Sequence, residues 1–307
     1  MMRVLLFGSN GLVGSSCKSV LKGSSKVTEL KSSNRNDTDL FDYQQTKQAI
    51  ESFKPDLIIN AAAKVGGILA NNTQRVEFLT ENLKINLNIL ESVISNKNIK
   101  VINLGSSCIY PLDAENPIKE DYFMSGKLEP TNSPYALAKI TAIELGASIT
   151  SQYGNEIINL MPTNLYGPGD NFSETSSHVI PGLLRRMHKA KLNNDDKFEI
   201  WGTGKPLREF LFAEDLADCI EFILDKEVRQ NLINVGSGHE VSILNLANMI
   251  KNIIGFKGDL SFDSSKPDGN PRKLLDSSVI NSLGWKPKTE LEEGLKITYE
   301  WFLKNEN

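Results

Sequence analysis

The chain of 307 residues lacks the features that mark several large classes of protein. It has no uninterrupted run of about 20 apolar residues, so we expect no membrane-spanning helix. The apolar segment before Gly8 is too short for the core of a signal peptide, and we expect a cytoplasmic protein. Lysine and arginine form no basic cluster and the formal net charge is -4, so nucleic acid is not an expected partner.

Cysteine and histidine are scarce as well, with three residues of each type. Cys17, Cys108 and Cys219 lie far apart in the sequence and form no CxxC pair or mixed cluster with histidine. We therefore expect neither a disulfide framework nor a metal site. A mildly acidic chain needs local arginine or lysine side chains to hold a phosphorylated ligand, which directs attention to the few basic residues near its motifs.

Short apolar segments alternate with helical segments through the first half of the chain. Strands are expected at 3–7, 56–60, 101–105 and 157–162, and helices at 15–22, 83–93 and 134–151. Repeated strand–helix units of this kind predict an α/β fold with a doubly wound parallel sheet of the Rossmann type.

The pattern changes after Pro162, where loops rich in asparagine, glycine, serine and proline begin. We expect short helices at 163–177 and 264–272, and a return to the main sheet at 210–224 and 232–236. The predicted division is a Rossmann domain, 1–165 plus about 210–238, and a smaller, interleaved C-terminal α/β substrate lobe, 166–209 plus about 239–307. Such a lobe would meet the sheet at the carboxyl ends of its strands, where ligands bind in these folds.

A glycine-rich loop follows the first predicted strand directly. Gly8, Gly11 and Gly14 have the spacing that permits a tight turn, close approach of the backbone to a pyrophosphate, and close packing of helix on strand. The amino end of the following helix favours phosphate. A plain strand–turn–helix is the alternative, but the motif has the required context, and we expect a dinucleotide site.

The end of the second strand distinguishes NAD from NADP. NAD sites usually place a carboxylate there to bind the ribose 2′-hydroxyl, whereas this chain has no carboxylate between Leu30 and Asp37. Lys31, Ser33 and Arg35 would suit a 2′-phosphate, and the guanidinium of Arg35 suits it best. The alternative is that Arg35 is a solvated loop charge. The sequence favours NADP.

Tyr135 and Lys139 lie four residues apart on a predicted helix, so their side chains share one face. A nearby ammonium stabilises tyrosinate, and we expect it to lower the pKa of the phenol toward neutral pH. Tyr135 could then give a proton to a carbonyl oxygen during hydride transfer, and Lys139 could reach the cofactor ribose. Two exposed helix residues are the alternative for an isolated YxxxK pair.

Ser106 and Ser107 follow a strand and should lie at the rim of the sheet. A hydroxyl there can bond a substrate carbonyl beside the tyrosine, although either serine could instead cap the local backbone. The glycine loop, these serines and the Tyr135–Lys139 pair together resemble the extended short-chain dehydrogenase/reductase family, over nearly the whole chain.

Longer stretches resemble one group within that family, the GDP-L-fucose synthases. They are AAAKVGG at 61–67, GSSCIYP at 105–111, MPTNLYG at 161–167, SHVIP at 177–181 with LLRR at 183–186, WGTG at 201–204 with REFL at 208–211, and KPDG at 266–269 with PRKL at 271–274. The resemblance implies conversion of GDP-4-keto-6-deoxy-D-mannose to GDP-L-fucose, by epimerisation at C3 and C5 and then reduction of C4 with NADPH.

The resemblance also assigns roles to Cys108 and His178 as the groups that remove and deliver protons during epimerisation. Thiol and imidazole both titrate near neutral pH, and Ser106 and Tyr135 would stabilise the enolate oxygen. A small buried cysteine and a satisfied loop histidine are the alternatives. His188 and His239 have no comparable context and are expected to be structural.

The same resemblance gives the expected ligand contacts. Arg186 and Arg208 suit the pyrophosphate of GDP, whereas Arg185 should face solvent or form an ion pair. The expected substrate-binding residues are Ser107, Cys108, Asn164, Arg186, Trp201, Arg208, Asp268 and Lys273. The expected cofactor-binding residues are Gly8, Ser9, Asn10, Gly11, Leu12, Val13, Gly14, Arg35, Asp39, Leu40, Ala61, Ala62, Leu104, Gly105, Ser106, Tyr135, Lys139, Pro162, Thr163, Asn164, Leu165 and His178. Asn10 departs from the family, which often carries a basic residue there. This weakens the case for NADP slightly, although Arg35 can still supply the charge.

Other activities of the family fit less well. A sugar 4,6-dehydratase needs an acidic pair after its catalytic serine or threonine, where this chain has Cys108 and Ile109. A 4-epimerase would not need Cys108 and His178. A C4 reductase of another GDP-4-keto sugar, such as a heptose, stays open, and a non-catalytic nucleotide-binding protein is a remote alternative. The resemblance implies a homodimer formed through the helices at 83–94 and 134–151.

Overall fold

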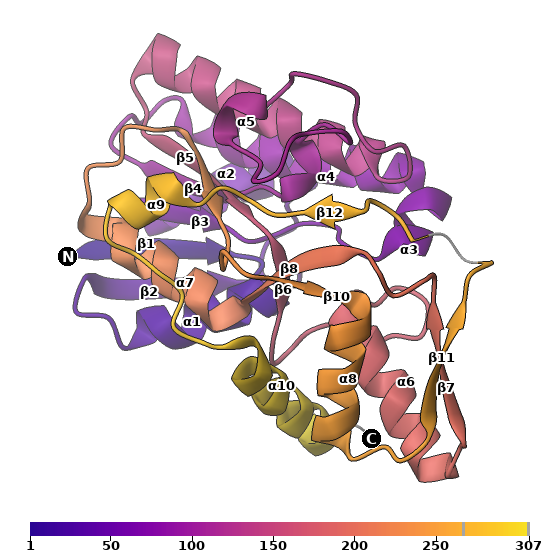
Figure 1. Ribbon diagram of the computed structural model, residues 1–307. Helices are drawn as coiled ribbons and strands as arrows, with labels where there is room; N and C mark the ends of the chain where they lie inside the picture. Colours follow the sequence, from indigo (N-terminus) through magenta and orange to yellow (C-terminus); the bar gives the residue numbers. More distant parts are fainter. Residues whose placement is uncertain (266–267, 306–307) are drawn as a thin grey trace.

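Six parallel strands form the central sheet (Figure 1). The structure is a computed structural model that describes residues 1–265 and 268–305. The strands lie in the order β2-β1-β3-β4-β5-β9. Their bounds are β1 Met2–Phe7, β2 Val27–Ser33, β3 Leu57–Asn60, β4 Lys100–Leu104, β5 Ile157–Pro162 and β9 Leu232–Val235. Apart from the edge strand β2 these are apolar runs, as parallel strands covered on both faces require. The predicted doubly wound Rossmann fold is confirmed.

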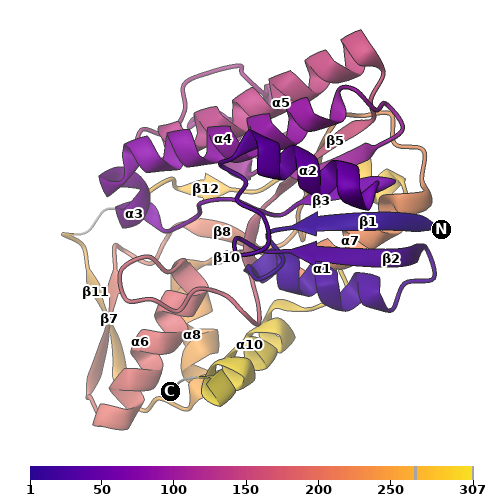
Figure 2. The same ribbon diagram turned by 180° about the vertical axis from the view of Figure 1, so that it is seen from behind.

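Helices cover both faces of this sheet (Figures 1 and 2). Leu5 and Phe7 of β1 pack in a core with α2, α4 and α5, while Val4 and Leu6 pack on the other face with α1 and α7. The covering helices are α1 Leu12–Lys22, α2 Tyr43–Phe53, α4 Arg75–Val93, α5 Ser133–Tyr153 and α7 Ala213–Phe222. Alternation along β1 therefore sends side chains into two separate cores.

The long helix α5 has clear signals at both of its ends. Pro134 lies in its first turn, where proline costs no helical hydrogen bond. Gly154 ends it in a left-handed conformation with φ of 81°. The helix predicted at 134–151 is thus confirmed with slightly wider bounds, and its first turns carry Tyr135 and Lys139.

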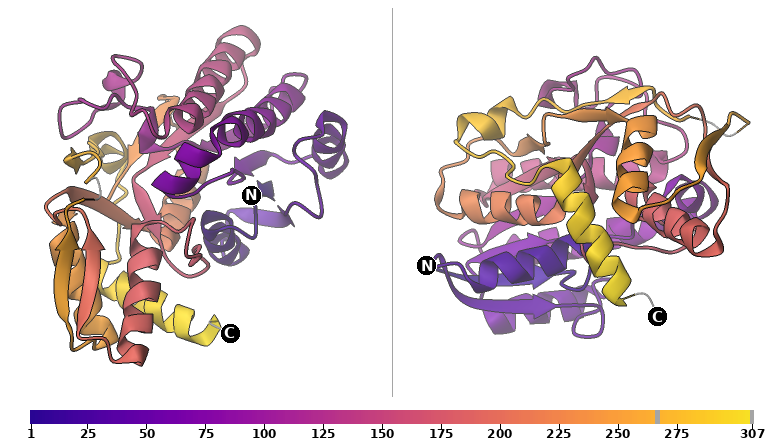
Figure 3. Two further views of the ribbon diagram at one scale, coloured as in Figure 1. Left: turned by 90° about the vertical axis from the view of Figure 1, so that its right-hand side faces the viewer. Right: turned by 60° about the horizontal axis from the view of Figure 1, so that its bottom comes forward.

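A second lobe lies beside the carboxyl ends of the main strands (Figure 3). Its strands are β6 Asn164–Tyr166, β7 Lys197–Trp201, β8 Leu207–Phe212, β10 Glu240–Ser242, β11 Asp259–Asp263 and β12 Arg272–Lys273, and its helices are α6 Val179–Asn193, α8 Ile243–Ile254 and α10 Leu291–Asn305. Strand β8 pairs antiparallel with β10 and parallel with β6 and β12. Strands β7 and β11 form a separate parallel pair.

Strand β8 lies between the two lobes. Leu211 packs in the core under the main sheet, whereas Phe210 and Phe212 pack in the core of the second lobe. The segment 210–224 returns to the main sheet only through α7, because β8 belongs to the smaller sheet. The prediction for 232–236 is confirmed, since β9 joins the edge of the main sheet beside β5.

The predictions of two helices are wrong. The segment 163–177 contains the short strand β6 and turns, because Gly167 and Gly169 adopt positive φ angles around Pro168. The described part of 264–272 is also not helical and ends in β12, whereas Lys266 and Pro267 lie outside the described residues. None of the described helices is long and apolar enough to cross a membrane.

The chain crosses between the lobes more often than the predicted boundaries suggest. Ile280, from helix α9 (Ser278–Ser282), and Trp285 are buried in the core under the main sheet. The division into two lobes stays a prediction, but its last range, 239–307, did not anticipate this return.

Candidate active site

The glycine loop after β1 forms a tight cradle. Gly8 has a φ of +78°, and a Cβ there would lie 2.6 Å from the backbone nitrogen of Ala62. A Cβ on Gly14 would collide with the carbonyl oxygen of Gly8. Helix α1 begins at Leu12, within the glycine motif, so the N–H groups of its first turn, which lack partners inside the helix, lie at this loop. Only glycine fits at these two positions, because the loop packs closely against the start of α1 and the chain after β3.

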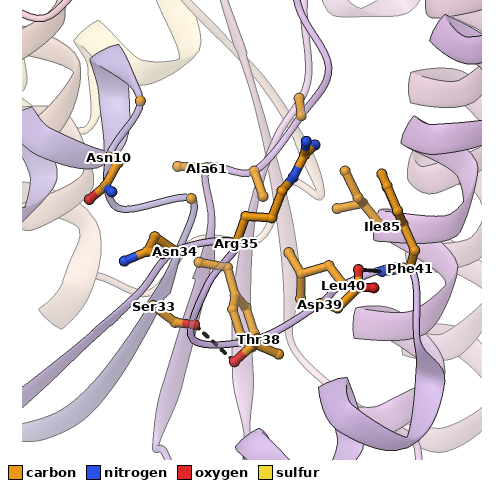
Figure 4. A pocket seen from close by; sticks show the side chains of 15 residues that line it. Asn10, Ser33, Asn34, Arg35, Thr38, Asp39, Leu40, Phe41, Ala61 and Ile85 are labelled. Atoms are coloured by element: carbon orange, nitrogen blue, oxygen red, sulfur yellow. Dashed lines mark hydrogen bonds between the residues drawn. The ribbon is translucent and has the colours of Figure 1, made fainter.

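A cavity of about 210 Å³ lies at this loop, past the carboxyl ends of β2, β1 and β3 and beside the point where the order of the strands reverses (Figure 4). Ligands of doubly wound sheets bind at this point. The residues that line the cavity are Phe7, Gly8, Asn10, Gly11, Ser33, Asn34, Arg35, Thr38, Asp39, Leu40, Phe41, Ala61, Ala62, Ala63 and Ile85.

Ser33 and Arg35, two of the three residues expected beside a 2′-phosphate, line this pocket, whereas Lys31 does not. Ser33 ends the strand and donates a 2.9 Å hydrogen bond to Thr38. The side chain of Arg35 extends across the pocket in Figure 4, with its guanidinium carbon 5.5 Å from the centre of the Phe41 ring. The carboxylate of Asp39 accepts the backbone N–H of Phe41 at 2.9 Å. Arg35 is therefore the charge best placed to meet an anionic group.

Lys139 lies buried on α5 and points back toward the end of β4. Its ammonium donates a 2.7 Å hydrogen bond to the carbonyl oxygen of Leu104 and lies 5.7 Å from the centre of the Tyr135 ring. Burial lowers the pKa of Lys139 to about 8, and a charge on Cys108 opposes that change. Lys139 can therefore exchange its proton near neutral pH.

Tyr135 is half-buried beside Lys139, and its ring meets Phe78 edge-on at 6.2 Å. Burial and the neighbouring Cys108 raise the pKa of Tyr135 above its ordinary value, while a hydrogen bond with Ser106 lowers it. The expectation that Lys139 lowers this pKa is wrong, because burial disfavours tyrosinate and Lys139 bonds to Leu104. A protonated phenol is the form that can give a proton to a carbonyl oxygen.

Ser106 and Cys108 meet just past the end of β4. The serine oxygen lies 3.0 Å from the cysteine sulfur and accepts the backbone N–H of Cys108 at 3.3 Å. This second bond caps the short 3-10 helix Ser107–Ile109, so Ser106 has a local structural role beside any chemical one. Ser107 is buried, whereas Ser106 and Cys108 remain partly open to solvent. Together with Tyr135 they form one cluster.

His178 approaches from the second lobe, at the residue that precedes α6. His178 as a whole is exposed to solvent. Its ring is nevertheless surrounded by enough protein that desolvation lowers the pKa of His178. A hydrogen bond with the backbone of Gly66 partly offsets this effect. The imidazole is therefore mainly neutral at pH 7 and able to accept a proton.

The residues of the second lobe that were expected to bind GDP form two groups, one around Arg186 and one around Arg208. The guanidinium of Arg186 lies 5.3 Å from the Trp201 ring and 5.0 Å from the Phe198 ring. Trp201 is 58% exposed, so an aromatic surface remains open beside this cation. Desolvation lowers the pKa of Arg186, as expected for a cation that keeps few waters.

Arg208 belongs to the second group, on β8. One of its nitrogens donates to the carbonyl of Asp268 at 3.4 Å, and Lys273 of β12 lies beside it in register. The Asp268 carboxylate accepts the backbone N–H of Thr203 at 2.6 Å and its hydroxyl at 2.7 Å. Asp268 therefore ties two loops together around Arg208.

Glu209, next to Arg208, was missed by the sequence reasoning. It is fully buried, and its carboxylate accepts the N–H groups of Gly238 at 2.7 Å and Leu275 at 3.0 Å. Its carbonyl oxygen accepts the hydroxyl of Thr163 at 3.2 Å and the amide of Asn164 at 2.9 Å. Burial raises the pKa of Glu209. An acidic residue directly followed by three apolar residues, in the strand sequence LREFLF, was the available signal.

A row of buried asparagines was missed as well. Asn60 donates to Asn103 at 2.8 Å, and Asn103 donates to Asn159 at 3.0 Å, across three neighbouring strands. Asn60 also donates to Asn86 of α4 at 3.1 Å. Each strand sequence has one asparagine among apolar residues, and this repeated interruption could have revealed the row.

Two other histidine and arginine predictions are confirmed. His188 is buried and bonds the hydroxyl of Tyr299 at 2.8 Å, which is a structural role. Arg185 forms an ion pair with Glu174 at 2.8 Å. Within residues 1–265 and 268–305, no cluster of three or more histidine, cysteine or acidic side chains could hold a metal ion.

Comparison with known families agrees with this geometry. Residues 4–236 match the model of the NAD dependent epimerase/dehydratase family. The chain belongs to this family.

Similar members of the family act on GDP-linked sugars, according to their names. GDP-L-fucose synthase 1 of Arabidopsis thaliana is 47% identical over 99% of this chain and 94% of its own. The crystal structure of an NADP-bound GDP-L-fucose synthetase from Naegleria fowleri is 31% identical, with a TM-score of 0.88 over 98% of this chain and 94% of that one. An NADP-bound GDP-mannoheptose C4 reductase from Campylobacter jejuni is 35% identical, with a TM-score of 0.87 over 98% of both chains.

Proposed function

We propose that the protein is an NADPH-dependent epimerase and reductase that converts GDP-4-keto-6-deoxy-D-mannose to GDP-L-fucose. The cluster of Ser106, Cys108, Tyr135 and Lys139 carries this proposal, because it joins a thiol to the hydroxyls needed for carbonyl chemistry. Simple carbonyl reduction would need no thiol. The names of the relatives support the same activity.

The residues at the sheet switch point fit a dinucleotide phosphate. The cradle of Gly8 and Gly14 excludes side chains, and Arg35 lines the pocket just past the end of β2, where residues 31–36 include no carboxylate. We assign Arg35 to the 2′-phosphate and the glycine loop to the pyrophosphate. Thr163 and Asn164, fixed by the carbonyl of Glu209, would hold the nicotinamide end. When bound, NADPH supplies the hydride for C4.

Epimerisation comes first in the proposed sequence. Protons at C3 and C5 are acidified by the C4 ketone, because the resulting carbanion spreads onto oxygen as an enolate. We assign Ser106 and Tyr135 as hydrogen-bond donors to that oxygen. Cys108 and His178 would exchange protons with the two carbons, and the lowered pKa of His178 leaves its imidazole free to accept one.

Reduction uses the same phenol differently. Tyr135 would give its proton to O4 as the C4 ketone becomes an alcohol, since burial keeps the phenol protonated. Lys139 would then help to restore that proton, because the pKa of its buried ammonium is about 8. The hydrogen bond from Lys139 to Leu104 holds the ammonium beneath the tyrosine ring until the cofactor ribose is bound.

The GDP end would lie on the second lobe. Arg186 and Arg208 suit the pyrophosphate, since guanidinium groups bind phosphate oxygens in pairs. The exposed ring of Trp201, held by Arg186, offers a surface for the sugar nucleotide. Asp268 and Lys273 stay predicted contacts beside Arg208.

A second candidate function has support in the comparisons. The similarity to the GDP-mannoheptose C4 reductase favours a reductase of a GDP-4-keto-heptose with weak or no epimerase activity. The presence of Cys108 beside Ser106 favours the epimerase instead. The test supplies each GDP-4-keto sugar with NADPH and identifies the product. GDP-L-fucose supports the first function, and reduction of the heptose alone supports the second.

We also propose that the protein is a cytoplasmic homodimer. All three cysteines are free, which suits a reducing compartment. Helices α4 and α5 pack side by side on one face (Figure 2), and Leu137 of α5 is 47% exposed on it. Light scattering tests the assembly, and a mass near 68 kDa, twice the chain mass of 34.1 kDa, would support a homodimer. If the Leu137→Glu variant were a monomer, the interface would include this part of α5.

A further inference from the structure

The loop of residues 61–67 connects the cofactor pocket to His178. Ala61, Ala62 and Ala63 line the pocket at its first end. At its other end, the backbone of Gly66 hydrogen-bonds the imidazole of His178. The loop therefore contacts both the cofactor site and one of the two groups assigned to proton transfer.

The far end of this loop is packed tightly against the segment that carries His178. The N–H of Gly67 donates to the carbonyl of Ser176 at 3.1 Å. A Cβ on Gly67 would lie 2.6 Å from the carbonyl oxygen of Ser177, so no other residue fits there without a shift. The position of the Gly66–Gly67 backbone therefore sets the position of the chain just before His178.

Asn71 holds that backbone from the other side. It lies on the short helix α3 (Ile68–Thr73), and its amide donates to the carbonyl of Gly66 at 2.6 Å and to the carbonyl of Gly67 at 3.1 Å. The side chain is buried, with 7% exposure, and its own oxygen has no hydrogen-bond partner in the structure. A buried acceptor without a partner is unfavourable, so the donor half of the amide is what this position provides.

We propose that Asn71 is a positioning residue for His178, acting through the carbonyl groups of Gly66 and Gly67. The effect of Asn71 on catalysis rests on the proposed epimerase function. Its effect on the position of His178 does not. Asn71 fixes the Gly66 carbonyl, and that carbonyl fixes the orientation of the imidazole. Without the amide, the loop would move and His178 would lose its alignment with the sugar carbons.

The chain makes this inference measurable, because it contains only three histidines. The pKa of His178 is measured by NMR titration of the imidazole nitrogens in the full-length protein, with His188 and His239 as internal references. Two variants, Asn71→Ala and Asn71→Ser, are measured. If one of them does not fold, the other still tests the proposal. Asn72→Ala, at an exposed neighbour on the same helix, is the matched control.

The Gly66 hydrogen bond raises the pKa of His178, so its loss should lower that pKa in both Asn71 variants and leave it unchanged in Asn72→Ala. His188 and His239 should titrate as in the wild type. An unchanged or higher pKa of His178 in the Asn71 variants would overturn the proposal. Because this measurement needs no substrate, it stands even if the proposed function is wrong.

A second measurement separates positioning from general damage. Exchange of substrate protons with deuterated solvent should fall roughly ten-fold or more in the Asn71 variants. Oxidation of GDP-L-fucose by NADP⁺, which bypasses epimerisation, should keep its wild-type rate within about two-fold. Equal losses in both reactions would contradict the positioning role. No exchange by the wild type would count against the proposed function, and the titration alone would then decide the role of Asn71.

Discussion

The hydroxyl oxygen of Ser106 lies 3.0 Å from the sulfur of Cys108, at the end of the strand that also supplies the carbonyl partner of Lys139. This contact joins a group suited to proton exchange at carbon with a group suited to holding an oxyanion. The thiol would act on the acidic carbon and the hydroxyl on the ketone oxygen. Both groups are needed close together, because the acidic carbon is bonded to the carbonyl carbon. One site can therefore epimerise and then reduce without releasing the sugar.

Replacement of Cys108 by serine tests the first of these tasks. Cys108→Ser should slow the exchange of substrate protons with solvent by about a hundred-fold or more, since a serine hydroxyl is a much weaker acid than a thiol and is hardly ionised at neutral pH. NADPH binding and thermal unfolding should stay as in the wild type. A variant that made GDP-L-fucose at the normal rate would show that Cys108 is not the proton-transfer group.

Removal of the phenol tests the second task. Tyr135→Phe should lower kcat for reduction by about a hundred-fold to ten-thousand-fold with little change in KM, because only the proton donor is lost. Tyr153→Phe, at an exposed position of the same helix, is the control. Steady-state kinetics with NADPH measures both. Similar kcat values for the two variants would contradict the role of Tyr135.

The preference for NADPH should depend on Arg35. Arg35→Ala should raise KM for NADPH by about ten-fold to a hundred-fold and leave KM for NADH nearly unchanged, because only NADPH carries the 2′-phosphate. Arg229→Ala, with an exposed side chain elsewhere, is the control. If both cofactors lost affinity equally, Arg35 would be shaping the pocket rather than binding the phosphate.

Asp170 makes the stability of the protein depend on pH. Its side chain is buried with one oxygen unpartnered, and burial raises its pKa from 3.8 to about 7. The folded state thus holds this proton more tightly than the unfolded chain, so the contribution of Asp170 to stability is greatest below about pH 4 and is lost as the pH rises toward 7.

Asp170→Asn removes the charged form and with it that decline. The variant should gain up to about 4 kcal/mol at pH 8 and nearly nothing at pH 4, the upper limit following from the raised pKa. Thermal unfolding of both proteins across this range measures the difference. A gain of the same size at both pH values would mean that the charge is not its source.

The sequence predicted the sheet well, and it singled out Ser106, Cys108, Tyr135 and Lys139, whose side chains the structure brings together. Apolar runs such as 57–59 are unambiguous, and the glycine loop and the Tyr135–Lys139 spacing each follow from local geometry. Contacts that join distant segments were not predictable in the same way. The N–H groups of Gly238 and Leu275 donate to Glu209, and Asn71 donates to the carbonyl of Gly66. These bonds depend on how loops meet in the folded chain.

Electrostatics was the least accessible part from sequence. The spacing of Tyr135 and Lys139 suggested a lowered pKa for the phenol, but burial raises it instead. The two helices wrongly expected at 163–177 and 264–272 also failed because contacts made in the folded chain outweigh a local preference. Glycines with positive φ and the pairing of β6 and β12 with β8 override the local preference for helix.

The most direct test of the epimerase and reductase function is the reaction of GDP-4-keto-6-deoxy-D-mannose in deuterated water with NADPH, followed by NMR of the product. We predict GDP-L-fucose that carries solvent deuterium at both C3 and C5. A product reduced at C4 with its original hydrogens and configuration at C3 and C5 would contradict the assignment of Cys108 and His178, and would make the protein a reductase alone.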